Sequence, residues 1–343
     1  MKKKSEILPN NICFITHQLE HLHNVSVSVS FKAGSLYESK YNNGISHLVE
    51  HLFFRQLSDL SQESLYFNMQ KIGGEITGKT YCDYVTFSIN VIPQYLYDAL
   101  DIMLKFFDDF EWSNSIILKE KEVVLRQIEN KAYSYNQWID SIYFENTKYT
   151  LPIMGTKKTV KSLTAFEINS WKKEYFSPAN SCVTITGNFS NEFYDFLKQK
   201  LSIINNFGKK QAPIIEIAPN FTKRNSDNYL TVINADSKLS EVVVLFDIKN
   251  SFDYESVKLI TSILSDGCGS KLSMIMREKY QLTDDIFTQL TSYCGFHRYS
   301  ISYTVKNKNI FNSIDILFKI INEIKTDITL NEYASTIPFF TDN

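Results

Sequence analysis

One order of predicted elements occurs twice along this chain of 343 residues. In the segment 24–35, Val25, Val27, Val29 and Phe31 alternate with serines, which is typical of a half-buried strand. Each copy is predicted to contain, in order, two strands, two helices, two strands and a helix. The first copy covers 12–18, 24–35, 44–54, 61–74, 75–92 and 93–110, where 75–92 holds two strands around a turn. The second copy covers 229–234, 240–250, 252–265, 267–281, 287–294, 297–307 and 310–325. This order indicates an internal repeat and therefore two similar units.

The length of the chain also suits two domains. The segment 205–228 holds two prolines together with several lysines and asparagines, and we expect the linker there. The predicted division is a first domain over 1–207, a linker over 208–228 and a second domain over 229–343. The second copy has no counterpart of 150–204, so we expect a truncated second domain with apolar surface left to be covered.

The bulk composition excludes several classes of protein. A net charge of −2 with 22% charged residues offers no basic footprint for nucleic acid. No apolar run reaches the 18 residues that a membrane span needs, and polar residues interrupt the lysine-led first segment, unlike a signal peptide. The odd number and wide spacing of the cysteines predict reduced thiols and a cytoplasmic location: Cys13, Cys82, Cys182, Cys268 and Cys294.

The segment GISHLVEHLFF carries the strongest chemical signal. Its apolar residues favour a helix, with Ser46 as its expected N-terminal cap, on which His47, Glu50 and His51 share one face. Two imidazoles one turn apart can bind Zn²⁺, and a carboxylate beside them can take a proton from the water on the metal. This is the H-x-x-E-H order of inverzincins. The alternative is chance, because five of the six histidines lie in the first 51 residues.

Several blocks in order decide between these readings. GISHLVEHLFF, GGEITGKTYCDYVTFSINV, LPIMGTKKTVKSLT, EYFSPANSCVTITGNF and GCGSKLSMIMREKYQL together resemble the M16 family of zinc peptidases, which includes pitrilysin, the mitochondrial processing peptidases and insulin-degrading enzyme. The resemblance covers almost the whole chain. It implies an α+β fold of two homologous domains, each a mostly antiparallel sheet with helices on one face. It also implies a clamshell chamber in which a peptide adds a strand to a sheet edge.

The resemblance assigns roles to residues of the metal site. His47 and His51 correspond to zinc ligands and Glu50 to the general base. The third ligand is a glutamate in the family, but Gln127 stands at that position, and its neutral amide oxygen is a weaker partner for Zn²⁺. The segment 113–144 is predicted to form one long amphipathic helix. On this helix Glu129 would face away from the site. Glu120 would hold one of the histidines in place without itself binding the metal. The alternative is that Glu120 is a solvent-exposed acid on the helix.

The second half of the family pattern is incomplete here. Arg277 stands at the position of an arginine that holds the substrate carbonyl, but Asp284 replaces the tyrosine that accompanies it. Tyr280 would point elsewhere if the helix continues. An ionised acid cannot donate a hydrogen bond to a developing oxyanion, so the clamp is expected to be broken. Thr77 replaces the family's substrate-contacting asparagine.

These features predict one subunit of a zinc-dependent endopeptidase that cleaves short or unfolded peptides, such as a leader peptide or propeptide. The short second domain and the broken clamp predict a paralogous partner chain in a heterodimer. A homodimer is the other assembly considered. The rival hypothesis is an impaired, peptide-binding support subunit, which Gln127, Asp284 and Thr77 favour and the intact H-x-x-E-H motif opposes.

Overall fold

The computed structural model describes residues 2–130, 139–140, 143–144, 147–205, 237–248, 253–267, 269–293, 296–326 and 328. The chain divides into two compact units, Met1–Glu216 and Ile217–Asn343, each of which is described by itself. The predicted linker over 208–228 and the predicted strand over 229–234 lie outside the described residues, so the proposed domain limits remain a prediction.

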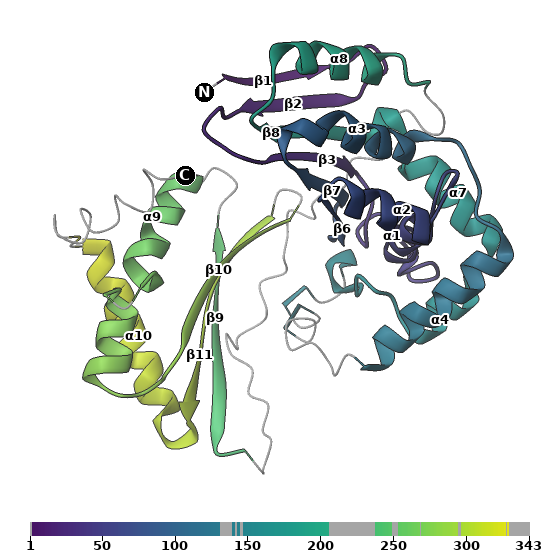
Figure 1. Ribbon diagram of the computed structural model, residues 1–343. Coiled ribbons are helices and arrows are strands. Elements are labelled where there is room, and N and C mark those ends of the chain that lie inside the picture. Colours follow the sequence, from purple (N-terminus) through teal and green to yellow (C-terminus); the bar gives the residue numbers. More distant parts are fainter. Residues whose placement is uncertain are drawn as a thin grey trace. The chain divides into compact units, whose positions relative to one another are not determined.

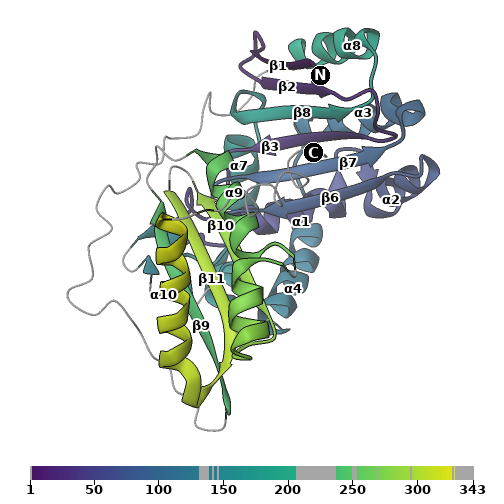
Figure 2. The same ribbon diagram turned by 90° about the vertical axis from the view of Figure 1, so that its left-hand side faces the viewer.

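A six-stranded sheet organises the first unit, and Figure 2 shows its strands side by side. Every neighbouring pair is antiparallel except β2 and β8, which are parallel. The strand order is β1 (Lys2–Ile7), β2 (Cys13–Gln18), β8 (Ser181–Gly187), β3 (Val25–Phe31), β7 (Val85–Val91) and β6 (Glu75–Thr80). The sheet is thus mostly antiparallel, as predicted, and β6 forms one of its edges.

One face of this sheet carries the core. In β3 the valines and Phe31 are fully buried and the serines between them are only half-buried, so the alternation in the sequence matches the two faces. The helices pack on the apolar face and contribute to one continuous core (Figure 1). They are α1 (Ile45–Arg55), α2 (Gln62–Lys71), α3 (Leu96–Leu104), α4 (Asn114–Asn130), α6 (Lys157–Ser162), α7 (Ala165–Tyr175) and α8 (Asn191–Ser202).

Shorter elements connect these helices and strands. A two-stranded hairpin of β4 (Gln56–Leu57) and β5 (Leu60–Ser61) joins α1 to α2. Single 3₁₀ turns occupy Pro93–Tyr95, Lys105–Phe107, Lys148–Thr150 and Pro178–Asn180. The long helix expected over 113–144 is described as α4 to Asn130, and much of its predicted second half lies outside the described residues.

The start of α1 differs from the prediction that Ser46 caps it. Gly44 is the N-cap, with φ +93°, and a Cβ there would lie 2.6 Å from the carbonyl oxygen of Met154. The Ser46 hydroxyl instead accepts hydrogen bonds from the Gly34 N–H (3.0 Å) and from Nε1 of Trp171 (3.2 Å). The cap prediction was wrong because long-range partners use this hydroxyl.

The buried carboxylate of Glu38, rather than the Ser46 hydroxyl, accepts hydrogen bonds from the N–H groups at the start of α1. Glu38 is 0% exposed, and it accepts hydrogen bonds from the N–H of Gly44 (2.8 Å), the N–H of Ser46 (2.9 Å) and Nδ2 of Asn43 (2.8 Å). Burial raises the pKa of Glu38, although these donors oppose the rise. The acid occupies the positive end of the helix that carries the histidines.

The second unit is a smaller α+β layer. Its antiparallel sheet has the order β10 (Ile286–Tyr293), β11 (Phe296–Lys306) and β9 (Leu239–Ile248). Helices α9 (Tyr254–Ser265) and α10 (Ile310–Thr326), the π-helical segment Ser273–Lys279 and the 3₁₀ turn Asn307–Asn309 complete its described part. Leu264, Leu272, Met276 and Leu317 are buried in a core of its own. An α+β fold in both units confirms the predicted fold class.

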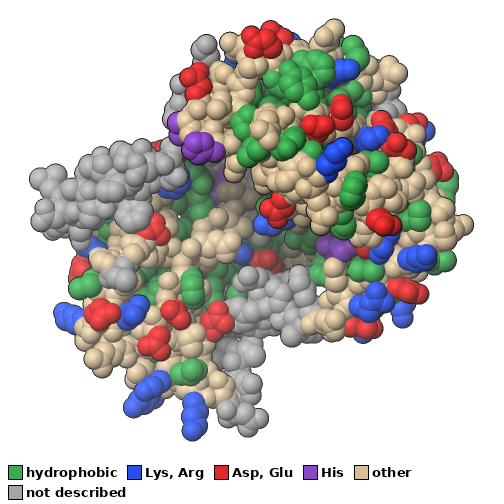
Figure 3. Space-filling model, viewed as in Figure 1, with side chains coloured by type: hydrophobic (Ala, Val, Ile, Leu, Met, Phe, Trp, Pro, Cys, Tyr) green, Lys and Arg blue, Asp and Glu red, His purple; other side chains and the backbone are tan. Residues whose placement is uncertain are grey.

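The surface and the thiols fit the composition. Acidic and basic side chains are interspersed over the face seen in Figure 3, as expected for a net charge of −2. Within the described residues, no helix is long and apolar enough to cross a membrane. Cys13, Cys82 and Cys182 carry free thiols, whereas Cys268 and Cys294 lie outside the described part. The cytoplasmic location remains a prediction.

Candidate metal centre

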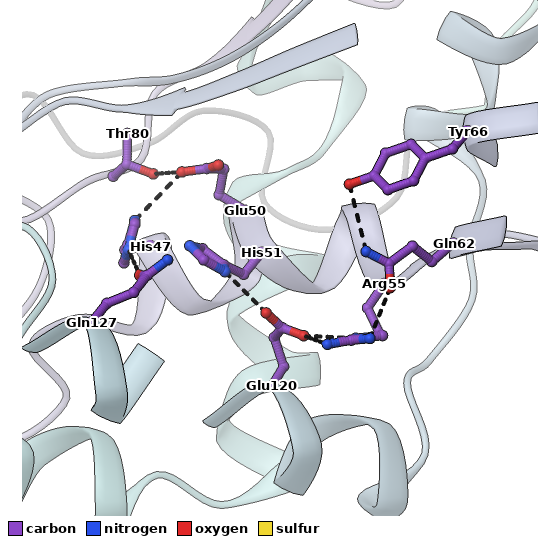
Figure 4. A network of polar contacts seen from close by, with 9 residues as sticks. All are labelled: His47, Glu50, His51, Arg55, Gln62, Tyr66, Thr80, Glu120 and Gln127. Carbon is purple, nitrogen blue, oxygen red and sulfur yellow. Dashed lines mark hydrogen bonds and ion pairs between the residues drawn. The ribbon is translucent and has the colours of Figure 1, made fainter. Parts of the chain in front are cut away.

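Helix α1 brings His47, Glu50 and His51 to one face, as their spacing predicts (Figure 4). The two imidazole centroids lie 4.6 Å apart. The opposite face of α1 is anchored in the core by Leu48, Leu52 and Phe53, so the helix cannot rotate without exposing apolar side chains. The polar face is thereby fixed toward α4 and β6.

The ring of His47 has two oxygen neighbours. Its Nε2 lies 3.4 Å from Oε1 of Gln127, and its buried Nδ1 lies 3.4 Å from Oε2 of Glu50 without making a hydrogen bond. A neutral imidazole has one N–H, so it cannot donate to both oxygens. With the proton on Nε2, the ring donates a long hydrogen bond to Oε1 of Gln127; with the proton on Nδ1, Nε2 and Oε1 are two acceptors that a cation could bridge.

The ring of His51 is oriented by Glu120. Nδ1 of His51 lies 2.9 Å from Oε1 of Glu120, a residue that is 4% exposed, which excludes the alternative of a solvent-exposed helix acid. Burial acts to raise the pKa of Glu120, but hydrogen bonds from His51 and Arg55 and the charge of Arg55 hold it below its ordinary value. An ionised Glu120 accepts the Nδ1 proton and leaves Nε2 of His51 as a free acceptor.

These residues form a donor set that fits Zn²⁺. Nε2 of His47, Nε2 of His51 and the amide oxygen of Gln127 are nitrogen and oxygen donors of the kinds that zinc accepts. No three His, Cys, Asp or Glu side chains gather around a metal position in the described part of the chain, and the amide of Gln127 is the third candidate donor beside the two histidines. Glu129 is not that donor, because it is 53% exposed and pairs with Lys157 at 3.1 Å.

Glu50 has a neighbour that sequence reasoning missed. The Thr80 hydroxyl, on the edge strand β6, donates a 2.8 Å hydrogen bond to Oε2 of Glu50. Burial acts to raise the pKa of Glu50, but contact with His47 and the hydrogen bond from the Thr80 hydroxyl hold it below its ordinary value. The carboxylate is therefore ionised and held in place, which a proton acceptor requires.

The strand β6 passes very close to Glu50. A Cβ at Gly78 would lie 2.8 Å from Oε1 of Glu50 and 2.4 Å from the ring of Phe54, so only glycine fits there. Gly78 and Thr80 share a strand face, and Thr77 lies on the other. Thr77 is exposed and paired with Ser88, so its predicted contact with substrate would not involve the face beside Glu50.

The predicted substrate residue Arg277 belongs to the second unit. It is exposed and its Nε lies 3.3 Å from Oε1 of Glu278. It lines a cavity of about 170 Å³ with Ser273, Asp284 and Asp285. Tyr280 follows the π-helical segment directly, and its side chain is exposed. The cavity contains an arginine and an acid where the family pattern has an arginine and a tyrosine, and the role of Arg277 remains a prediction.

Two family models match consecutive parts of the chain. A family model described as insulinase (peptidase family M16) matches residues 14–157, and one described as peptidase M16 inactive domain matches residues 162–337. The chain belongs to the M16 peptidase family. The first match includes His47, Glu50, His51, Glu120 and Gln127, and the second includes Arg277.

Three individual proteins with known names share between 18% and 25% of aligned residues with this chain. An uncharacterized zinc protease of Rickettsia felis is 22% identical over 330 residues, which are 94% of this chain and 76% of that protein. The mitochondrial-processing peptidase subunit beta of Saccharomyces cerevisiae is 25% identical over 168 residues, 48% of this chain and 36% of that protein. The crystal structure of a protease from Helicobacter pylori shares the fold, with a TM-score of 0.84 at 18% identity over 99% of this chain and 85% of that one.

Proposed function

We propose that this chain is a subunit of a zinc-dependent endopeptidase. The observation that carries the proposal is the gathering of three possible ligands beside an ionised Glu50: Nε2 of His47 lies 3.4 Å from Oε1 of Gln127, and the ring of His51 lies 4.6 Å from that of His47. His47, His51 and Gln127 would hold the metal. The name of the Rickettsia felis relative, a zinc protease, supports the same assignment.

Each side chain then has a defined task in peptide hydrolysis. Bound zinc would supply Lewis acidity toward the scissile carbonyl and the attacking water. Glu50 would accept the proton of the water and return it to the leaving amine, while Thr80 keeps its carboxylate in place. Glu120 would keep Nε2 of His51 free of a proton and aimed at the metal.

The substrate that suits this site is an extended peptide. The edge strand β6 passes directly beside Glu50, and an edge strand offers unpaired main-chain groups to which a peptide can add as a further strand. Main-chain pairing demands an extended backbone and tolerates many sequences. We therefore propose short or unfolded peptides, including a leader peptide or propeptide, as substrates.

We further propose a paralogous M16-like partner chain. Asp284 cannot replace the oxyanion-binding tyrosine, so a complete substrate clamp would come from another subunit. The yeast relative is itself named a subunit, which supports a heteromeric assembly. A homodimer would leave both copies with Asp284, which makes it the weaker arrangement.

A second candidate is a peptide-binding support subunit without catalysis of its own. The specific observation in its favour is Gln127, because an amide oxygen attracts Zn²⁺ less than a carboxylate does. Such a chain would present β6 to the peptide and leave hydrolysis to its partner.

Metal content and cleavage separate the two candidates. The chain is purified alone and together with an M16-like chain that carries both the arginine and the tyrosine of the clamp, bound zinc is measured by mass spectrometry, and cleavage of an unstructured peptide library is followed. Zinc in this chain with cleavage that needs His47 and His51 is expected. Absence of zinc from this chain in both preparations would overturn the catalytic proposal and leave the support role.

Gln127→Glu is expected to tighten zinc binding by about 10- to 100-fold, because a charged ligand adds Coulomb attraction to the metal. Competition with a zinc chelator measures the change. Gln70→Glu, an exposed position on α2, is the matched control for the added charge and should leave the affinity unchanged. Equal affinities of Gln127→Glu and wild type would mean that another residue is the third ligand.

A further inference from the structure

Arg55 binds the carboxylate that orients His51. Its Nε (2.7 Å) and Nη2 (2.6 Å) both reach the same oxygen, Oε2 of Glu120 (Figure 4). The other oxygen, Oε1, is then left for Nδ1 of His51 at 2.9 Å. His51 and Arg55 lie one turn apart on α1, whereas Glu120 comes from α4, so this contact joins the two helices that hold the proposed ligands.

The guanidinium is itself held from the other side. Nη1 of Arg55 donates a 2.7 Å hydrogen bond to Oε1 of Gln62 on α2, and Nε2 of Gln62 lies 3.5 Å from the hydroxyl of Tyr66. The donors of an arginine form a rigid planar fork. Gln62 and Glu120 hold the guanidinium from two sides and so fix its plane. The orientation of the Glu120 carboxylate is fixed with it.

The direction of His51 depends on this arrangement. A carboxylate with one partner can turn about its terminal bond and offer either oxygen, and the imidazole would then follow it. Arg55 removes that freedom by occupying Oε2. Partners of this kind behind metal ligands affect metal affinity by about 10- to 100-fold.

We propose that Arg55 is a positioning residue for the metal centre, which fixes the Glu120 carboxylate so that Nε2 of His51 points at the metal. The proposal rests on the zinc site of the proposed function. It assigns Arg55 no contact with substrate or metal, and Gln62 acts by holding the guanidinium.

Electrostatics alone predicts the opposite sign, which makes the proposal easy to test. Removing a positive charge near the site would by itself tighten the binding of a cation. If positioning dominates, Arg55→Met weakens binding instead. Arg126→Met is the matched control, because Arg126 is an exposed arginine on α4 beside Gln127 and has no described contact with the network.

The experiment measures the zinc dissociation constant of the full chain by chelator competition, and the absorption spectrum of its Co²⁺ form. Arg55→Met is expected to weaken zinc binding by about 10- to 100-fold and to change the Co²⁺ spectrum. Arg55→Lys keeps the charge but loses the fork, and should fall between Arg55→Met and wild type. Arg126→Met should bind as wild type does.

A further variant tests whether weaker zinc binding results from loss of folding. Arg55→Met leaves the buried Glu120 without its charged partner, so the metal-free form of this variant is compared by thermal melting with that of Arg55→Met/Glu120→Gln, which removes the buried charge. The double variant should melt near wild type yet still bind zinc more weakly, since nothing fixes the amide. If the wild-type chain binds zinc and Arg55→Met or the double variant binds it equally tightly, the role of Arg55 is overturned, but the proposed metal site is not. Absence of zinc from wild type overturns the proposed site as well.

Discussion

Glu50→Gln is expected to lower peptide cleavage by about 10²- to 10⁴-fold while zinc stays bound, which is the range associated with loss of a general base. Glutamine has nearly the same shape but cannot take a proton from water. Its carbonyl oxygen can still accept the hydrogen bond of the Thr80 hydroxyl, so the local packing against β6 is preserved. Rates are measured on an unstructured peptide, and bound zinc is measured on the same sample.

Two controls make this result specific. Glu122→Gln makes the same chemical change at an exposed position on α4 and should leave the rate unchanged. Bound zinc in Glu50→Gln should equal that in wild type, because Glu50 is not a proposed ligand. Cleavage at the wild-type rate by Glu50→Gln would show that another group is the base, or that catalysis resides in the partner chain.

Glu38→Ala is expected to reduce the free energy of unfolding by about 2–4 kcal/mol, because the N–H groups of Gly44 and Ser46 at the buried start of α1 lose the carboxylate that accepts their hydrogen bonds. The donors left behind are the N–H groups of Gly44 and Ser46, and each unsatisfied buried donor is costly, whereas Nδ2 of Asn43 keeps its hydrogen bond to the carbonyl of Pro152. Since whole domains are stable by about 5–15 kcal/mol, this is a large fraction. Urea unfolding of the metal-free chain gives the value.

The same substitution should also weaken zinc binding, since His47 lies in the first turn of α1 and fraying there would misplace its ring. Glu20→Ala, which removes an exposed acid, is the comparison for stability and should change it by less than about 0.5 kcal/mol. A Glu38→Ala chain as stable as wild type would mean that water or a rearranged loop replaces the carboxylate.

Local patterns in the sequence carried much of the fold. The alternation in 24–31 predicted β3, and the spacing of His47, Glu50 and His51 predicted a shared helix face, because strand and helix periods act over a few residues. The strand β1 was missed, since its lysine-rich sequence is not typical of a strand and its structure depends on pairing with β2. Resemblance to the M16 family, rather than periodicity, pointed to Gln127.

Contacts between distant segments could not be predicted from such local patterns. The sequence left Glu120 as either a partner of a histidine or an exposed acid, and only the packing of α4 against α1 buries it. Thr80, Arg55 and Glu38 were not singled out, because their roles arise from neighbours on other elements or in the folded loop before α1. Ser46 was misread as a cap for the same reason.

The sequence by itself therefore determined the family, the α+β class and the H-x-x-E-H face, all of which follow from local spacing and ordered blocks. The tertiary structure decided which groups surround that face. It set Oε1 of Gln127 against His47, an ionised Glu120 against His51 and Thr80 against Glu50, because side-chain contacts between distant segments depend on how helices and strands pack.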